Sequence, residues 1–183
     1  MESRGLPDGF HRVDCLVRED PSTGDELAEV QSAADWKPCA PRGMDRSFSG
    51  KTYWFRLRDP IELQPLILVL EWKVLWEVDL FSVSAQGVTR HMQTGIRRVR
   101  STWPLPIGDY PAFPIETSQK NTWYLRLYSG GVRLGFPISL LTREEFERRV
   151  ELESQIEFAY AGILLPMVAL AFLFAAGLRE RLY

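Results

Sequence analysis

Hydrophobic and polar residues divide this chain into a long alternating part and a short, uniformly apolar end. Residues 158–178 contain no Asp, Glu, Lys, Arg, His, Asn or Gln. At about 1.5 Å per residue, a helix of about 20 residues matches the ~30 Å hydrocarbon core of a bilayer. A buried helix in a soluble protein of this size normally keeps a polar side, and this segment has none. The pattern therefore predicts a transmembrane helix.

Alternation with a period of two dominates the sequence before this segment. In residues 123–129, Trp123, Leu125 and Leu127 fall on one face, and the residues between them fall on the other. Residues 66–70 are apolar throughout, which suits a central strand covered on both faces. The pattern predicts strands at residues 12–17, 53–58, 66–70, 74–83, 88–92, 112–116, 123–129 and 132–141, and a short helix at 25–34. Turn signals at intervals of about 8–12 residues favour an all-β fold, an antiparallel jelly-roll-like β-sandwich followed by one long C-terminal transmembrane helix.

The chain divides into five segments. We expect a disordered leader at 1–12, an extracytoplasmic β-sandwich domain at 13–141, a juxtamembrane helix at 142–157, the transmembrane helix at 158–178 and a cytoplasmic end at 179–183. Thr142 and Glu145 have the spacing of a capping box, which predicts that a helix begins there without a flexible linker. Arg179 and Arg181 follow the apolar segment, and basic residues favour the cytoplasmic side.

Composition excludes several classes of function. The 22 Lys and Arg residues are balanced by 24 Asp and Glu residues, so there is no electrostatic case for nucleic acid, and membrane lipid is the expected partner of the apolar segment. His11 and His91 are isolated, so we expect no metal site, and no motif indicates a cofactor. No convincing pair of carboxylates supports glycosidase chemistry, and we expect no enzyme. Cys15 and Cys39 can pair outside the cytoplasm or remain as two buried thiols.

Two groups of residues are candidates for ligand binding. The first is the polar face of two strands, where aromatic rings offer flat surfaces to a sugar and arginines offer planar donors to hydroxyls or carboxylates. Its members are Trp54, Arg56, Arg58, Tyr124, Arg126 and Tyr128. The alternative is a solvated sheet face with cation–π pairs between the strands.

The second group lies on a loop, where binding residues concentrate. Its members are Arg97, Arg98, Arg100 and Trp103. The alternative is a charged, solvated loop in which Trp103 covers the edge of the sandwich. We expect Trp72, Trp76 and Trp123 to belong to the core.

The order of several short motifs resembles a known family. They run from Glu19-Asp-Pro-Ser-Thr-Gly24 through Tyr53-Trp-Phe-Arg56, Glu77-Val-Asp-Leu-Phe81, Ala112-Phe-Pro-Ile115, Trp123-Tyr-Leu-Arg-Leu127 and Phe136-Pro-Ile138 to Tyr160-Ala-Gly-Ile163. The chain resembles the type 2 extracellular domain of bacterial seven-transmembrane receptors with diverse intracellular signalling modules (7TMR-DISM), over nearly its whole length.

This resemblance implies a periplasmic jelly-roll sensor anchored in the inner membrane that binds a carbohydrate or a similar small solute. Its further partners would be membrane helices or a signalling module outside this chain. The alternative function is a membrane-anchored adaptor that contacts another envelope protein without signalling. A large exposed apolar patch without a concave site would favour the adaptor.

Overall fold

The computed structural model describes residues 11–12, 15–20, 27–39, 44–46, 50–57, 65–115, 121–128, 130–131 and 134–181. By internal contacts the chain separates into two units, Met1–Glu145 and Phe146–Tyr183. The first holds the strands, and the second holds most of one long helix.

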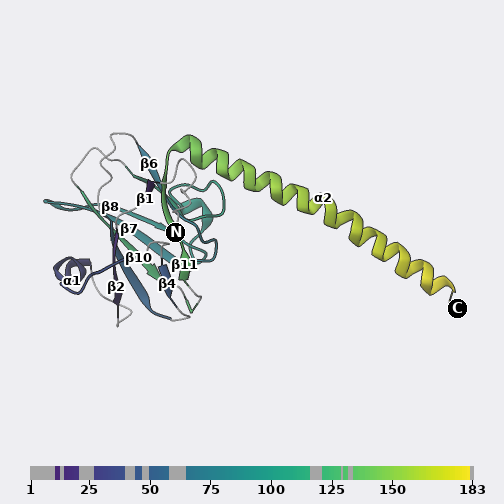
Figure 1. Ribbon diagram of the computed structural model, residues 1–183, viewed down its shortest axis with the longest axis horizontal. Helices are drawn as coiled ribbons and strands as arrows, with labels where there is room; N and C mark the ends of the chain where they lie inside the picture. Colours follow the sequence, from purple (N-terminus) through teal and green to yellow (C-terminus); the bar gives the residue numbers. More distant parts are fainter. Residues whose placement is uncertain are drawn as a thin grey trace, which may run out of the picture. The chain divides into compact units, whose positions relative to one another are not determined.

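The described strands of the first unit form two large antiparallel sheets and a small third one (Figure 1). The six-stranded sheet has the order β3 (Lys37–Pro38), β2 (Cys15–Asp20), β5 (Thr52–Leu57), β10 (Thr122–Tyr128), β7 (Glu77–Ser84) and β8 (Gly87–Thr94). The four-stranded sheet has the order β1 (His11–Arg12), β12 (Ile138–Leu141), β6 (Leu66–Leu70) and β9 (Ala112–Ile115). β11 (Leu134–Phe136) pairs with β4 (Met44–Arg46).

The two large sheets share one hydrophobic core. Leu68 of β6 and Phe113 of β9 belong to the same buried cluster as Phe55 of β5 and Leu125 of β10. Inward residues alternate with outward ones along β5 and β10, because successive side chains of a strand point to opposite faces. Two sheets packed over one core is the arrangement expected of a β-sandwich.

A second, smaller cluster covers the other face of the six-stranded sheet. The helix α1 (Leu27–Ser32) buries Val30 completely, and Val30 packs with Trp54 of β5 and Tyr124 of β10. Leu27, Trp36, Phe81 and Val83 pack around these three residues. The protein is therefore mostly β rather than strictly all-β, and its helix α1 lies within the expected helix 25–34.

Most of the predicted strands are confirmed, with local shifts. β7 begins at Glu77, three residues later than expected, so Val74 and Trp76 lie in the loop before it. Residues 11 and 12, assigned to the leader by the sequence, form β1 and pair with β12. Trp123 belongs to the core and Trp72 packs against it, whereas Trp76 lies outside the core cluster, which corrects its expected place.

Cys39 is disulfide-bonded, and the other cysteine of the sequence is Cys15. β2 and β3 pair with Leu16 opposite Pro38, a register that places positions 15 and 39 opposite each other at the next step. Disulfides persist in oxidising compartments.

The helix α2 (Arg143–Arg181) begins two residues after β12 ends and continues through Pro166. The predicted capping box is present: the Thr142 N–H donates to Glu145 Oε2 at 2.8 Å, and the Glu145 N–H donates to Thr142 Oγ1 at 3.3 Å. These reciprocal bonds satisfy donors that the first helical turn leaves without partners.

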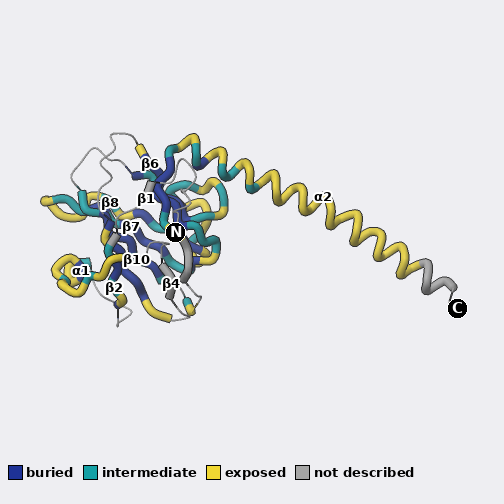
Figure 2. The backbone as a smooth tube through the Cα atoms, in the orientation of Figure 1, coloured by how far each residue is buried: buried dark blue, intermediate teal, exposed yellow. Residues whose placement is uncertain are grey.

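The segment of α2 up to Ala176 is long and apolar enough to cross a membrane. None of its most apolar window is buried, and Figure 2 shows most of the described helix as exposed. Phe158 and Phe172 are 76% and 74% exposed. Lipid is the environment in which so many exposed apolar side chains are favourable.

Candidate functional site

The structure brings part of the first candidate group together. β5 and β10 are neighbours, with Tyr124 opposite Arg56 and Arg126 opposite Trp54. These four residues therefore share the outer face of the six-stranded sheet, as the alternation predicts. Arg58 lies outside the described residues.

The aromatic rings of this group are covered rather than open. Trp54 is 1% exposed and Tyr124 is 6% exposed, because α1 and the segment after it lie over them. The Trp54 ring stacks on Phe81 at 5.8 Å between centroids, and Tyr124 meets Trp36 at 6.2 Å. Burial raises the pKa of the Tyr124 phenol, and the positive charge of Arg56 opposes this rise. Neither ring presents a free face on which a sugar could stack.

A buried carboxylate, Asp79, organises the polar part of the same face. Asp79 is 2% exposed, and its Oδ1 accepts a hydrogen bond from Gln93 Nε2 at 2.7 Å and lies 3.1 Å from His91 Nε2. Arg126 Nη1 lies 3.4 Å from its other oxygen, and Arg98 Nη2 lies 3.6 Å from Oδ1. The guanidinium groups offset the free energy of burying the negative charge. The β7–β8 register, with Asp79 opposite Gln93, explains the convergence.

Arg97 has different partners from the other arginines of its loop. Its guanidinium lies 4.2 Å from the centre of the Trp76 ring and 3.5 Å from Glu77 Oε1. The Tyr128 ring of β10 contacts the same indole edge-on, with 6.0 Å between the ring centroids. Gly130 has a φ of +61°, and a Cβ there would lie 1.9 Å from Trp76 Cδ2, so this position requires glycine.

The rest of the second candidate group lines a hollow of about 340 Å³ at one set of loops. We call it the loop hollow; it is lined by Lys73, Ile96, Arg98, Arg100, Trp103 and Asp109. Lys73 comes from the loop between β6 and β7, and the other residues come from the loop between β8 and β9, which contains the 3₁₀ turn η1 (Arg100–Thr102). The two loops are joined because the Ile96 N–H donates to the Leu75 carbonyl at 2.8 Å and the Arg97 N–H donates to the Trp76 carbonyl at 3.2 Å.

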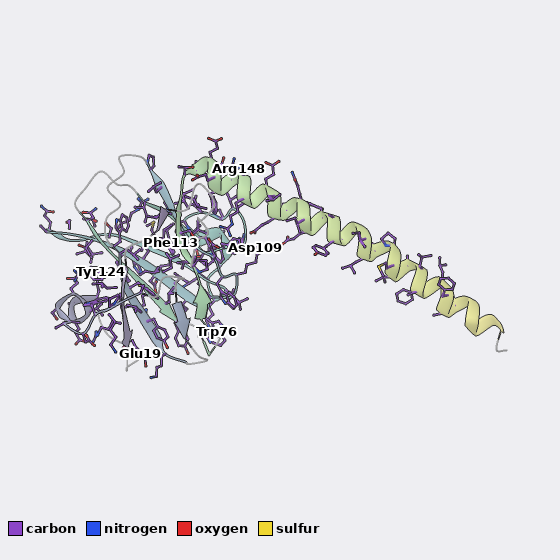
Figure 3. All side chains as sticks on the ribbon, viewed as in Figure 1. Glu19, Trp76, Asp109, Phe113, Tyr124 and Arg148 are labelled. Carbon is purple, nitrogen blue, oxygen red and sulfur yellow. The ribbon has the colours of Figure 1, made fainter. Side chains whose placement is uncertain are left out.

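Ion pairs and a ring contact hold the charged side chains of the loop hollow in place. Asp109 (Figure 3) lies 3.3 Å from Arg100 Nη1 and 3.5 Å from Lys73 Nζ. Arg100 lies over the Trp103 ring at 4.6 Å and donates to the Gly108 carbonyl. Trp103 is buried, and its Nε1 has no hydrogen-bond partner within the described structure.

The sequence alone indicates Arg98, Arg100 and Trp103 as candidate binding residues, but it does not indicate Lys73, Asp109 or Asp79. No local signal identifies Lys73 and Asp109, because they lie on different loops and meet only through the folded chain. Asp79 had a weak signal, since it is an acidic residue in the middle of an alternating strand. Among the described residues, no group of three His, Cys, Asp or Glu side chains is placed to hold a metal ion.

The chain thus combines an antiparallel β-domain, which has a hollow lined by cationic side chains, with a candidate membrane helix. The family model described as 7TMR-DISM extracellular 2 matches residues 12–142, and the chain belongs to this family, the extracellular sensing domains of membrane receptors. No curated protein matches the chain significantly.

Proposed function

We propose that this chain is a ligand-sensing module that binds a small, carbohydrate-like solute in the loop hollow and passes its bound state to the membrane through α2. The observation that carries the proposal is the hollow itself, where polar side chains from two separate loops converge around a buried indole. Its volume of about 340 Å³ is at the lower end of ligand pockets, which suits a small solute. The extracellular family supports the sensing role.

We place the domain in the periplasm and the end of α2 in the cytoplasm, with the inner membrane between them. The disulfide at Cys39 favours an oxidising compartment for the domain. Arg179 and Arg181 favour a cytoplasmic position for the other end of the apolar segment.

The proposed sandwich topology is a jelly roll. When the strands of a jelly roll are lettered B to I in chain order, its sheets have the orders B-I-D-G and C-H-E-F. Eight strands of this domain take these letters in chain order, from β1 (B), β5 (C), β6 (D) and β7 (E) to β8 (F), β9 (G), β10 (H) and β12 (I). The observed orders β1-β12-β6-β9 and β5-β10-β7-β8 then read B-I-D-G and C-H-E-F. β2 and β3 then extend the second sheet at its C edge. In this arrangement the loop hollow belongs to the D–E and F–G loops.

A short contact path supports coupling between the hollow and the start of α2. Glu71 stands two residues before Lys73, and its Oε1 accepts a hydrogen bond from Ser139 Oγ at 2.7 Å. The Glu71 N–H also donates to the Pro137 carbonyl at 3.2 Å. β12 ends at Leu141, so a displacement of the 71–76 loop acts on a strand that continues into the helix cap at Thr142.

We propose a binding rather than a catalytic role. The carboxylate of Asp109 is paired with Lys73 and Arg100, and that of Asp79 with Arg98 and Arg126. A glycosidase needs one carboxyl group that can stay protonated and a second one across the scissile bond.

The test is binding by the full chain in lipid nanodiscs. Neutral and acidic monosaccharides are titrated by calorimetry, and hydrogen exchange is followed with and without each sugar. We expect slower exchange in the 71–76 and 95–110 loops and a changed rate at residues 142–145. An insertion of about four glycines after Leu141 should keep binding but remove the change at 142–145, because the junction then has slack. If no sugar of the panel alters exchange in either loop, the sensing proposal is wrong.

One observation favours the adaptor as a second candidate. Val74, Ile96, Val99 and Ile107, on the loops that form the hollow, are exposed apolar residues. Such side chains around a recognition surface can contact a protein partner. A photo-crosslinking residue at position 99 would distinguish the adaptor from the sensor. Crosslinks to a partner protein that form equally with and without sugar would favour the adaptor.

A further inference from the structure

The loop hollow carries an excess of positive charge. Among the described residues that line it, Lys73, Arg98 and Arg100 are cations and Asp109 is the one carboxylate. A neutral sugar would not neutralise any of this positive charge. A solute with one negative charge would neutralise part of it through charge-assisted hydrogen bonds, which are roughly twice as strong as neutral ones.

The two guanidinium groups are held ready for an anion. Arg100 is fixed from one side by the Trp103 ring and from another by the Gly108 carbonyl. Arg98 is fixed by Gln93 Oε1 at 3.4 Å and by the buried Asp79. The Arg98 and Arg100 side chains still keep 33% and 45% of their surface exposed, so N–H donors remain within reach of a ligand. Groups fixed in this way lose little rotamer entropy on binding.

Asp109 restricts which anion fits. Its side chain is 53% exposed and its carboxylate accepts hydrogen bonds only, so it repels an anion that has no hydroxyl group to donate, such as sulfate. The same carboxylate accepts hydrogen bonds from hydroxyl groups. The lining therefore suits a solute that carries both a carboxylate and neighbouring hydroxyls.

We infer that the ligand of the loop hollow is a small hydroxylated carboxylic acid of the sugar-acid class. Its carboxylate contacts Arg98 and Arg100, and its hydroxyls donate to Asp109. Lys73 then donates to the ligand oxygens that lie between the carboxylate and these hydroxyls. This inference rests on the proposed function, because it names the chemical class of the solute that the same hollow binds.

The test compares D-glucuronate with its uncharged methyl ester and with inorganic sulfate, by calorimetry on the full chain in zwitterionic nanodiscs. We expect D-glucuronate to bind at least about tenfold more tightly than the ester, because only the acid forms bonds to the arginines in which both partners are charged. Arg100→Gln should weaken D-glucuronate binding at least about tenfold. Lys37→Gln is the matched control: it removes one positive charge from β3, at the opposite edge of the sheet from β8, and should leave the affinity unchanged.

A second variant keeps the inference testable if Arg100→Gln lowers the stability of the domain. Asp109→Asn removes the carboxylate that repels sulfate and accepts hydrogen bonds from hydroxyls, so the ratio of D-glucuronate to sulfate affinity should fall several-fold. An unchanged ratio overturns the role of Asp109 and with it the sugar-acid class.

The remaining outcomes are also decisive. Equal affinity for D-glucuronate and its ester overturns the inference but leaves the sensing proposal standing. Binding of sulfate in preference to D-glucuronate overturns it in favour of a simple anion site. If neither these sugars nor any neutral sugar binds, the inference and the proposed function both fail.

Discussion

Ser139 on β12 donates a hydrogen bond from its Oγ to Glu71 Oε1 at 2.7 Å, and Ser139 is 2% exposed. This bond joins the strand that precedes α2 to the loop that contains Lys73. Ser139→Ala leaves a half-buried carboxylate oxygen without this donor, so we expect a loss of about 1 kcal/mol in the free energy of unfolding. Chemical denaturation of the full chain in detergent measures this loss.

The same variant tests the coupling path. Sugar binding at the loop hollow should be retained, whereas the ligand-dependent change in hydrogen exchange at residues 142–145 should shrink. Ser32→Ala is the control, because Ser32 is exposed and its Oγ donates to the Glu29 carbonyl within α1. A full exchange response in Ser139→Ala would contradict the path.

Trp54 is predicted to act in stability rather than in binding. It is among the largest fully buried side chains, so Trp54→Ala should lower the free energy of unfolding by about 3–5 kcal/mol. Arg56→Ala, on the exposed position two residues along β5, should change it by less than about 0.5 kcal/mol. If the Trp54→Ala protein stays stable but loses all sugar binding, the prediction is wrong and the β5–β10 face is the binding site.

Tyr124 should make the domain sensitive to alkaline pH. Burial raises the folded-state pKa of its phenol above the ordinary value of 10.0, so the folded protein holds this proton more tightly than the unfolded chain does. The resulting stability is fully present below the unfolded pKa and is lost as pH rises through the folded pKa. Urea denaturation on both sides of pH 10 should show a smaller alkaline loss in Tyr124→Phe than in the wild type. Equal losses would show that the phenol is not desolvated.

Asp79 should stabilise the outer face of the six-stranded sheet. Asp79→Asn removes the negative charge that Arg98, Arg126 and Gln93 contact, so we expect the free energy of unfolding to fall by about 1–3 kcal/mol. Asp35→Asn provides the control. Asp35 pairs with Arg18, but its side chain is 63% exposed, so this ion pair stabilises the fold by at most about 1 kcal/mol. Equal effects of the two substitutions on thermal unfolding would contradict a special role for Asp79.

Local patterns predicted the elements well where one physical preference governed them. The fully apolar run at 66–70 became β6, with every residue buried, and the alternation at 123–129 became β10 with the expected inward face. The capping box at Thr142 also formed as predicted, because its bonds join residues only three apart. β7 began late because the backbone of Trp76 pairs with the loop that follows β8.

The sequence by itself determined which residues alternate, where α2 begins, and that its later part is apolar on all sides, because these properties depend on near neighbours. Only the tertiary structure decided that α1 covers Trp54 and Tyr124, that Arg97 separates from Arg98 and Arg100, and that Lys73 meets Asp109. Alternation assigns a residue to a face of a strand, but it says nothing of what packs over that face. The charged groups of the loop hollow lie on loops joined by hydrogen bonds across the fold, so their meeting follows from sheet topology rather than from spacing.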